Sequence, residues 1–435
     1  MVQSPRVSVL VSMACVSALL VTGCSSDETA NRAAAAAETT ESAPEVTASE
    51  TVPLDTPSAE PVSSAPQGEP WVVSLGDSYI SGEAGRWAGN QTWSTNAVDA
   101  LGAKAYHDSG TGETIERCHR SESALIHIGD AKSLNLACSG AITSTKITSE
   151  GWFKPGIDFY DEAEGKGQAL MLEEFAAENR VGLVALSIGG NDFKFAPVMA
   201  ECVKAYLEPA VFGAYCSKSA IAADTLSESN ISKVRSDITG AILNVAKAME
   251  NAGYQDSEWT LGVQLYPSPI AEASNNRYKE SGYDRQLKGG CGFRDEDGDW
   301  AIKTFLPRLN QTVAEALANA IQERPTLQAV TVDTSNAFAG RALCDKSVNR
   351  VRDNGGAMSW KDADAVDKSE WVMEVNMVNP RDTFGQESAH PNYWGQLALR
   401  SCWRQAWNGG SVRGGVCERD GTGLNAQGEP NMVLR

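Results

Sequence analysis

The sequence is short of basic residues and of closely spaced cysteines, and each shortage removes a class of function. Lys and Arg number 37 against 56 Asp and Glu, which gives a net charge of −19. Because an acidic surface repels a phosphate backbone, nucleic acid is excluded as a partner. No Cys-x-x-Cys pair occurs, which disfavours a zinc site. The Gly-x-Ser-x-Gly elbow of the large α/β-hydrolase family is also missing.

No apolar run is long enough to span a membrane as a helix. The run Val7–Leu20 is too short for that and follows Arg6, which is typical of an export signal. We therefore predict a signal peptide over residues 1–24. Its end, Val21-Thr22-Gly23-Cys24, resembles the lipobox of bacterial lipoproteins, which implies cleavage before Cys24 and a lipid on its sulfur. The alternative is an ordinary secretory signal in which this cysteine is incidental.

Residues 25–70 contain almost no aromatic or large aliphatic side chains and are rich in Ala, Ser, Thr, Pro and Glu. Such a segment buries too little apolar surface to offset the entropy of ordering, so we predict a disordered acidic tether. Its reach would be roughly 40 Å. We therefore predict that the protein is extracytoplasmic, anchored to the cell membrane through Cys24 and exposed to the cell envelope. Residues 71–435 form its folded domain.

Eight cysteines follow the leader, an even number that favours disulfides in an exported chain. Many connectivities are open, and pairing of sequence neighbours is the simplest: Cys118 with Cys138, Cys202 with Cys216, Cys291 with Cys344, and Cys402 with Cys417. The acidic run Asp295–Asp299 does not match a calcium loop, because Trp300 and Leu306 stand where glycine and glutamate are needed. No metal or cofactor is expected.

Short apolar runs alternate with amphipathic helical segments from Trp71 onward. Strands are predicted in the ranges Trp71–Leu75, Leu134–Ala137, Leu183–Ile188, Trp259–Tyr266 and Ala329–Val332, and the clearest helices in Ile231–Glu250 and Ala301–Glu323. This alternation predicts an α/β fold, with a mainly parallel central sheet covered by helices on both faces. Residues 85–117 and 341–385 are weakly periodic and are predicted as long loops over the active edge.

The first strand ends in Gly76-Asp77-Ser78, which places a serine at the carboxyl end of a parallel strand, where ligands bind in such sheets. Near the other end stand Glu387 and His390, three residues apart. A serine, a histidine and an acid supply a nucleophile, a general base and a group that orients the base. We predict these three as the catalytic residues.

Four blocks occur in the order found in the GDSL, or SGNH, hydrolases. They are Gly76-Asp77-Ser78, Gly140 after a strand-like run, Gly189-Gly190-Asn191-Asp192, and an acid-x-x-His-Pro motif. The surroundings of Cys118 and Cys138 are similar to the actinobacterial secreted esterase and lipase branch. The resemblance covers about residues 71–408. It implies the three-layer, flavodoxin-like α/β/α fold of that family.

The resemblance also implies an oxyanion hole formed by the backbone N–H groups of Ser78 and Gly140 and the side-chain amide of Asn191. His390 would be the general base. The family usually has Asp three residues before this histidine, whereas this chain has Glu387. A main-chain carbonyl or another acid such as Asp382 is the alternative that orients His390.

The function predicted from these residues is a serine esterase or lipase that hydrolyses carboxylic esters through a covalent acyl-enzyme. The substrate would be a lipid or an acylated envelope glycan, and the protein is expected to be a monomer. One alternative keeps the site but transfers acyl groups or deacylates glycans. The other is a non-catalytic envelope-binding lipoprotein built on the same scaffold.

Overall fold

A seven-stranded sheet lies at the centre of the described chain. The computed structural model describes residues 65–92, 95–208, 214–376 and 385–435. The spatial order of the strands is β11-β10-β9-β8-β7-β1-β2. All neighbours are parallel except β10 and β11, which are antiparallel. The strands are β1 (Trp71–Gly76), β2 (Lys132–Asn135), β7 (Val181–Ser187), β8 (Thr260–Leu265), β9 (Ala329–Asp333), β10 (Gly415–Leu424) and β11 (Pro430–Leu434).

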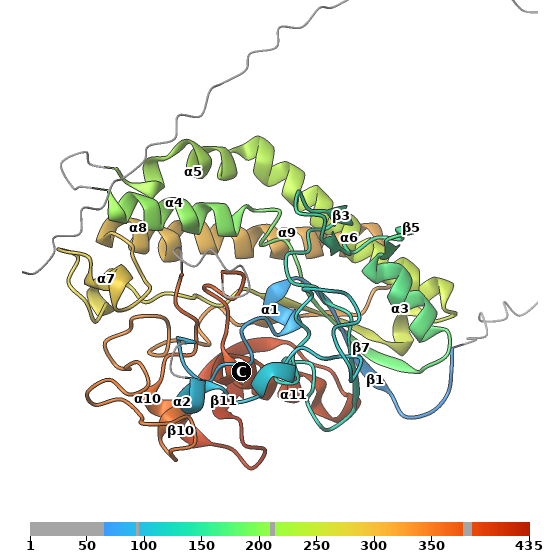
Figure 1. The fold of residues 1–435 in the computed structure, drawn as a ribbon. Helices are drawn as coiled ribbons and strands as arrows, with labels where there is room; N and C mark the ends of the chain where they lie inside the picture. The colour runs from blue at the N-terminus through green and yellow to red at the C-terminus, as the bar shows by residue number, and fades with distance from the viewer. Residues whose placement is uncertain (1–64, 93–94, 209–213, 377–384) are drawn as a thin grey trace, which may run out of the picture. The chain divides into compact units, whose positions relative to one another are not determined.

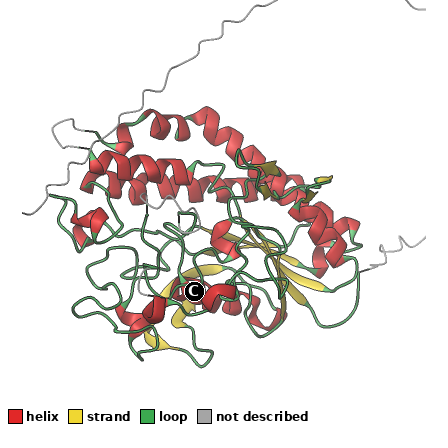
Figure 2. Ribbon diagram, viewed as in Figure 1, coloured by secondary structure: helices red, strands yellow, loops and turns green. Residues whose placement is uncertain are grey.

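Helices cover both faces of this sheet. On one side α3 (Gln168–Ala176), α6 (Glu228–Asn251) and α9 (Leu306–Glu323) pack next to one another, and α11 (Tyr393–Trp407) lies on the other (Figure 1). Figure 2 shows the same layers by type, with most helices gathered on one side of the strands. The fold is therefore a three-layer α/β/α arrangement with a mainly parallel sheet, which confirms the predicted fold class.

The remaining elements are short, apart from α4 (Phe195–Leu207), which follows β7. They are α1 (Ser78–Ser81), α2 (Thr95–Val98), α5 (Ala220–Thr225), α7 (Asp284–Leu287), α8 (Asp295–Trp300), α10 (Ala365–Lys368) and two small hairpins, β3 (Lys146–Ile147) with β4 (Phe153–Lys154) and β5 (Asp161–Glu162) with β6 (Gly165–Lys166). Long loops join them. The described parts of the two predicted loop regions contain only such short elements.

The central strands have apolar side chains on both faces because helices cover both faces. Val72, Val73 and Leu75 of β1 are fully buried, as are Val184 and Leu186 of β7. The predicted strands are confirmed to within two residues at each end. Because these strands are buried on both faces, the sequence shows them as continuous apolar runs rather than as alternating apolar and polar residues.

The predicted helix Ala301–Glu323 differs at its start, because Ala301–Phe305 is a π-helical turn that precedes α9. The sequence analysis also missed the hairpin of β10 and β11, which adds two strands to the edge beyond β9. The strand β10 contains three glycines and the charged run Glu418–Asp420, and such a pattern does not stand out as a strand.

All eight cysteines of the folded domain form disulfides. The pairs are Cys118–Cys138, Cys202–Cys216, Cys291–Cys344 and Cys402–Cys417, which confirms the neighbour pairing. The predicted signal peptide, Cys24 and nearly all of the tether lie outside the described residues. Within those residues, no helix combines the length and the apolar character needed to cross a membrane.

Candidate active site

Ser78 lies where β1 passes into α1, at the carboxyl edge of the sheet. The turn depends on Gly76, whose φ is +136° and where a Cβ would come within 2.0 Å of the Ser187 carbonyl oxygen. Asp77 caps α1 by accepting a hydrogen bond from the Tyr79 backbone N–H at 3.1 Å. Asp77 also accepts one from the Tyr266 hydroxyl at 2.5 Å. A buried side chain that is bonded in this way fixes the turn from which Ser78 projects.

His390 reaches Ser78 from the loop that leads into α11. Its Nε2 lies 2.6 Å from the Ser78 Oγ, a hydrogen bond between residues 312 positions apart. The loop is held by the Tyr79 hydroxyl, which donates to the Ala389 carbonyl at 2.9 Å. Met373 N–H donates to the carbonyl of His390 itself at 3.0 Å. The structure thus brings the predicted nucleophile and the predicted base into direct contact.

The surroundings favour the neutral imidazole that a general base requires. Burial lowers the pKa of His390 below its ordinary 6.5, against the negative charge of Glu83 and the nearby carbonyls of Ser388 and Glu387, which raise it. Nδ1 of His390 is buried and makes no hydrogen bond to the described residues within ordinary geometric limits. The main-chain carbonyls of Ser388 and Glu387 therefore act on the ring through their partial negative charge and not through a hydrogen bond to Nδ1.

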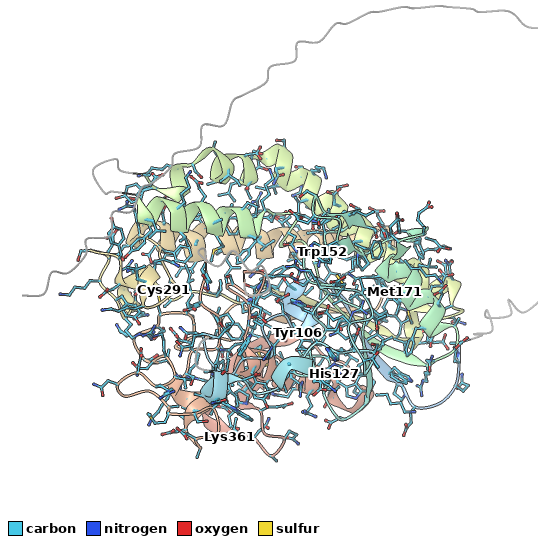
Figure 3. All side chains as sticks on the ribbon, viewed as in Figure 1. Tyr106, His127, Trp152, Met171, Cys291 and Lys361 are labelled. Carbon is cyan, nitrogen blue, oxygen red and sulfur yellow. A yellow bond between two sulfur atoms is a disulfide. The ribbon has the colours of Figure 1, made fainter. Side chains whose placement is uncertain are left out.

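The carboxylate of Glu387 does not contact His390. Its Oε2 accepts from the Trp87 indole N–H at 2.8 Å, and its Oε1 accepts from the Tyr106 hydroxyl at 2.5 Å. Tyr106 is labelled in Figure 3. Burial, with the charge of Glu83, raises the pKa of Glu387 to about 7. The prediction that Glu387 orients His390 by accepting its N–H is therefore wrong, because the donors of Trp87 and Tyr106 hold the carboxylate elsewhere. Asp382, a weighed alternative, lies outside the described residues.

Gly140 and Asn191 lie beside Ser78, at the ends of the strands that flank β1. Gly140 adopts a φ of +79° two residues after Cys138, whose N–H donates to the Gly76 carbonyl at 3.0 Å. The Asn191 side-chain amide donates one hydrogen bond to the Ala141 carbonyl at 2.8 Å, which ties it to the Gly140 loop. An amide carries a second N–H, so Asn191 keeps a donor for a ligand. Four of the predicted site residues thus meet in one place.

One cavity joins these four residues. Its volume is about 300 Å³, and Ser78, Gly140, Asn191 and His390 all line it. An apolar wall comes from α4, and this wall was not found from the sequence. Its residues are Phe195, Ala196, Met199 and Ala200. Val375, from a later loop, also lines the cavity. Helix α4 has an ordinary amphipathic pattern, so only the three-dimensional arrangement shows that it faces the site.

A second cluster missed by the sequence analysis joins the histidine loop to the Gly140 loop. Nδ1 of His119 lies 2.8 and 2.9 Å from the two carboxylate oxygens of Glu83, which is fully buried. Gln386 lies between the loops, and its Nε2 is 3.0 Å from Glu83 Oε2 and 2.8 Å from Ser139 Oγ. The charge of His119 lowers the pKa of Glu83 to about 2, against burial. His119 thus forms a buried ion pair with Glu83.

In the described part of the chain, no three His, Cys, Asp or Glu side chains are grouped so that they could hold a metal ion. The site supports the chemistry of an activated hydroxyl. Ser78 has a base at hydrogen-bond distance, and Gly140 and Asn191 line the same cavity, so a nucleophile, a base and candidate oxyanion donors meet there, as acyl transfer requires.

No protein-family model and no curated protein matches the chain. Among solved structures, an extracellular lipase from Streptomyces rimosus is 18% identical, with 75% of this chain and 94% of that chain covered and a TM-score of 0.38. A phospholipase A1 from Streptomyces albidoflavus is 18% identical, with 76% and 95% covered and a TM-score of 0.38. An acetyl xylan esterase from Butyrivibrio proteoclasticus is 12% identical, with 62% and 56% covered and a TM-score of 0.29. With TM-scores this low, the matches carry no argument about this chain.

Proposed function

We propose that the protein is a serine esterase of the SGNH type that hydrolyses carboxylic esters through an acyl-enzyme. The observation that carries the proposal is the 2.6 Å contact between Ser78 Oγ and His390 Nε2, in a cavity that Gly140 and Asn191 also line. A hydroxyl with a neutral imidazole at this distance has its base in place. Ser78 is only 6% exposed, so a substrate that enters the cavity meets it with little competing water.

The reaction begins when Ser78 Oγ attacks the ester carbonyl and its proton passes to His390 Nε2. The carbonyl oxygen becomes an oxyanion, which accepts hydrogen bonds from the backbone N–H groups of Ser78 and Gly140 and from the free amide N–H of Asn191. When the intermediate collapses, the ester bond breaks and His390 protonates the departing alcohol. Water then attacks the acyl group on Ser78, with His390 again as the base, and the acid is released.

The apolar wall of α4 favours an ester with an apolar acyl chain. Phe195 and Met199 lie on the same cavity as Ser78, so a carbonyl held at the serine leaves its acyl chain next to these side chains. Each buried CH₂ would contribute about 0.8 kcal/mol of binding. The long acyl chain of a lipid ester would bury more apolar surface against this wall than the acetyl group of an acetylated glycan would.

The proposal is tested with p-nitrophenyl acetate, butyrate, octanoate and palmitate as substrates and a fluorophosphonate probe as a label. We expect turnover and labelling in the wild type, and loss of both in Ser78→Ala. His390→Ala should lower kcat by about 10³-fold or more. Ser149→Ala, at an exposed serine of another loop, is the matched control and should behave as the wild type. A folded wild type that neither turns over any ester nor reacts at Ser78 would overturn the proposal.

The cell-envelope location rests on the leader and stays a prediction. Growth with an alkyne-tagged fatty acid should label the wild-type protein and not Cys24→Ala. Product analysis with water and sugar acceptors present together separates hydrolysis from acyl transfer, because only transfer yields an acylated sugar.

A further inference from the structure

Lys154 is a buried cation to which the described residues offer no carboxylate at ion-pair distance. The residue is 5% exposed, and its Nζ donates a 2.6 Å hydrogen bond to the Arg117 carbonyl. Among the residues that the structure describes, no carboxylate oxygen forms an ion pair with it. Lys154 also stands directly across the small hairpin from Lys146, and like charges in such a cross-strand pair destabilise it. Burial of an ammonium under these conditions costs stability, so packing alone does not account for a lysine here.

The ammonium lies behind the loop that carries Gly140. A Cβ built on Gly140 would have the Cε of Lys154 at 3.6 Å and its Nζ at 4.0 Å, with no other side chain or distant backbone within 4 Å. Lys154 does not line the catalytic cavity itself. The backbone of Gly140 therefore separates the positive charge from the place where a substrate carbonyl would develop negative charge.

A shared acceptor ties Lys154 to both loops of the site. The Arg117 carbonyl that accepts from Lys154 also lies 3.1 Å from the Gln386 amide nitrogen, on the loop of His390. The next residue is Cys118, whose disulfide holds Cys138 beside Gly140. The Arg117 guanidinium lies over the ring of Trp152, which Figure 3 labels, and its Nε donates to the side-chain oxygen of Gln386 at 3.1 Å. The position of the ammonium is thus fixed relative to the Gly140 N–H rather than free to relax.

We propose that the charge of Lys154 stabilises the tetrahedral oxyanion from behind the Gly140 loop, without contact between the lysine and the substrate. This proposal rests on the proposed esterase function and deepens it. An oxyanion forms only in the transition state, so the interaction raises kcat more than it lowers KM. At a separation of several ångströms in a partly buried site, one charge contributes about ten- to a hundredfold in rate.

The groups that face Lys154 set the pH at which its charge is lost. Burial lowers its pKa to about 8, with Arg117 and Lys146 acting in the same direction and Glu83 and Glu113 acting against it. The ammonium is therefore present below pH 8 and neutralised above it. The wild-type rate should accordingly fall above pH 8 toward the rate of an enzyme without this charge.

The test compares wild type, Lys154→Met and Lys154→Arg over pH 6–10, on the octanoate ester and by the rate of fluorophosphonate labelling of Ser78. At pH 7 we expect kcat to be ten- to a hundredfold lower in Lys154→Met, with KM nearly unchanged. The two enzymes should converge near pH 10. Lys154→Arg should keep the high rate throughout. Asp77, with a pKa raised by burial to about 7, is present in all three enzymes and cancels from the comparison.

A second variant keeps the test decisive if the Lys154 variants fold poorly. Lys146→Gln removes a charge that lowers the pKa of Lys154, so the alkaline fall should move to higher pH. Lys166→Met, at an exposed lysine paired with Glu174, is the control and should change nothing. A constant deficit of Lys154→Met at every pH, or an alkaline fall unmoved by Lys146→Gln, would overturn the proposal. Absence of any reaction at Ser78 in the wild type would instead overturn the esterase function.

Discussion

The serine side and the histidine side of the site are held in place by different means. Ser78 is positioned by its immediate neighbours in the chain, since Gly76 allows the turn, Asp77 caps it and the sheet fixes the strand. His390 is positioned by contacts with segments about three hundred residues earlier. These are the bond from Tyr79 to Ala389 and the two bonds that Glu387 receives from Trp87 and Tyr106.

Because of this difference, we expect substitutions on the two sides to have different effects on the fold and on turnover. A change on the serine side meets backbone and strand, which cannot move without loss of the fold. A change on the histidine side alters one of several side-chain contacts, and the others remain. Substitutions on the serine side should therefore have larger effects on turnover than substitutions on the histidine side.

Gly76→Ala should abolish activity and unfold or severely destabilise the domain. The new Cβ would lie 2.0 Å from the Ser187 carbonyl oxygen and 2.9 Å from Ile80, at a φ of +136° that alanine rarely adopts. We expect a loss of about 3 kcal/mol or more in the free energy of unfolding. Thermal unfolding and the p-nitrophenyl butyrate assay measure the two effects.

The matched control is Gly240→Ala, in the middle of α6, where a Cβ would have no atom within 4 Å. Removing a glycine from a helix interior should stabilise the domain by up to about 1 kcal/mol and leave the rate unchanged. If Gly76→Ala and Gly240→Ala had the same stability and the same activity, the backbone around Ser78 would not be rigid.

Asn191→Ala should lower kcat by about 10²–10³-fold with little change in KM. The variant loses the amide donor proposed for the oxyanion and also the bond to the Ala141 carbonyl. Asn244→Ala separates the two losses, because Asn244 makes a comparable bond to the Ile157 carbonyl away from the site. Asn244→Ala should match Asn191→Ala in unfolding temperature but not in rate. A rate within threefold of the wild type in Asn191→Ala would remove the amide from the oxyanion hole.

Residues placed by their neighbours in the chain can be predicted from the sequence, whereas residues placed by long-range contacts cannot. Ser78 and Asn191 follow buried strands and Gly140 follows the buried residues Leu136 and Ala137, and an apolar run that ends in a polar turn is visible without coordinates. The apolar wall of α4 and the pair of Glu83 with His119 are not visible, because long-range packing brings them together. The contacts of Glu387 are hidden from the sequence for the same reason, since its spacing from His390 fits a triad while its donors lie at positions 87 and 106.

Glu387→Gln should keep kcat within about tenfold of the wild type, because the glutamate oxygens bind Trp87 and Tyr106 rather than His390. An acid that orients the histidine in a triad behaves differently, and its amide replacement costs about 10⁴-fold in kcat. A glutamine retains one acceptor for these two donors, so some stability should be lost, about 1–3 kcal/mol. Steady-state kinetics together with chemical unfolding resolve the two effects. A fall in kcat near 10⁴-fold in a folded variant would return Glu387 to the triad.

Glu83→Gln should give the smallest change in rate and a defined shift in the pH profile. The rate depends on neutral His390, so it rises with pH through the pKa of His390, which burial holds below 6.5. The charge of Glu83 raises that pKa and the charge of His119 lowers it, with Glu83 the stronger of the two. Removing Glu83 should therefore move the acid limb of kcat/KM to lower pH, by up to about one unit. His119→Gln should move it to higher pH, since the opposing charge is then lost. If neither variant moved the acid limb, the buried pair would hold the loops together without acting on the base.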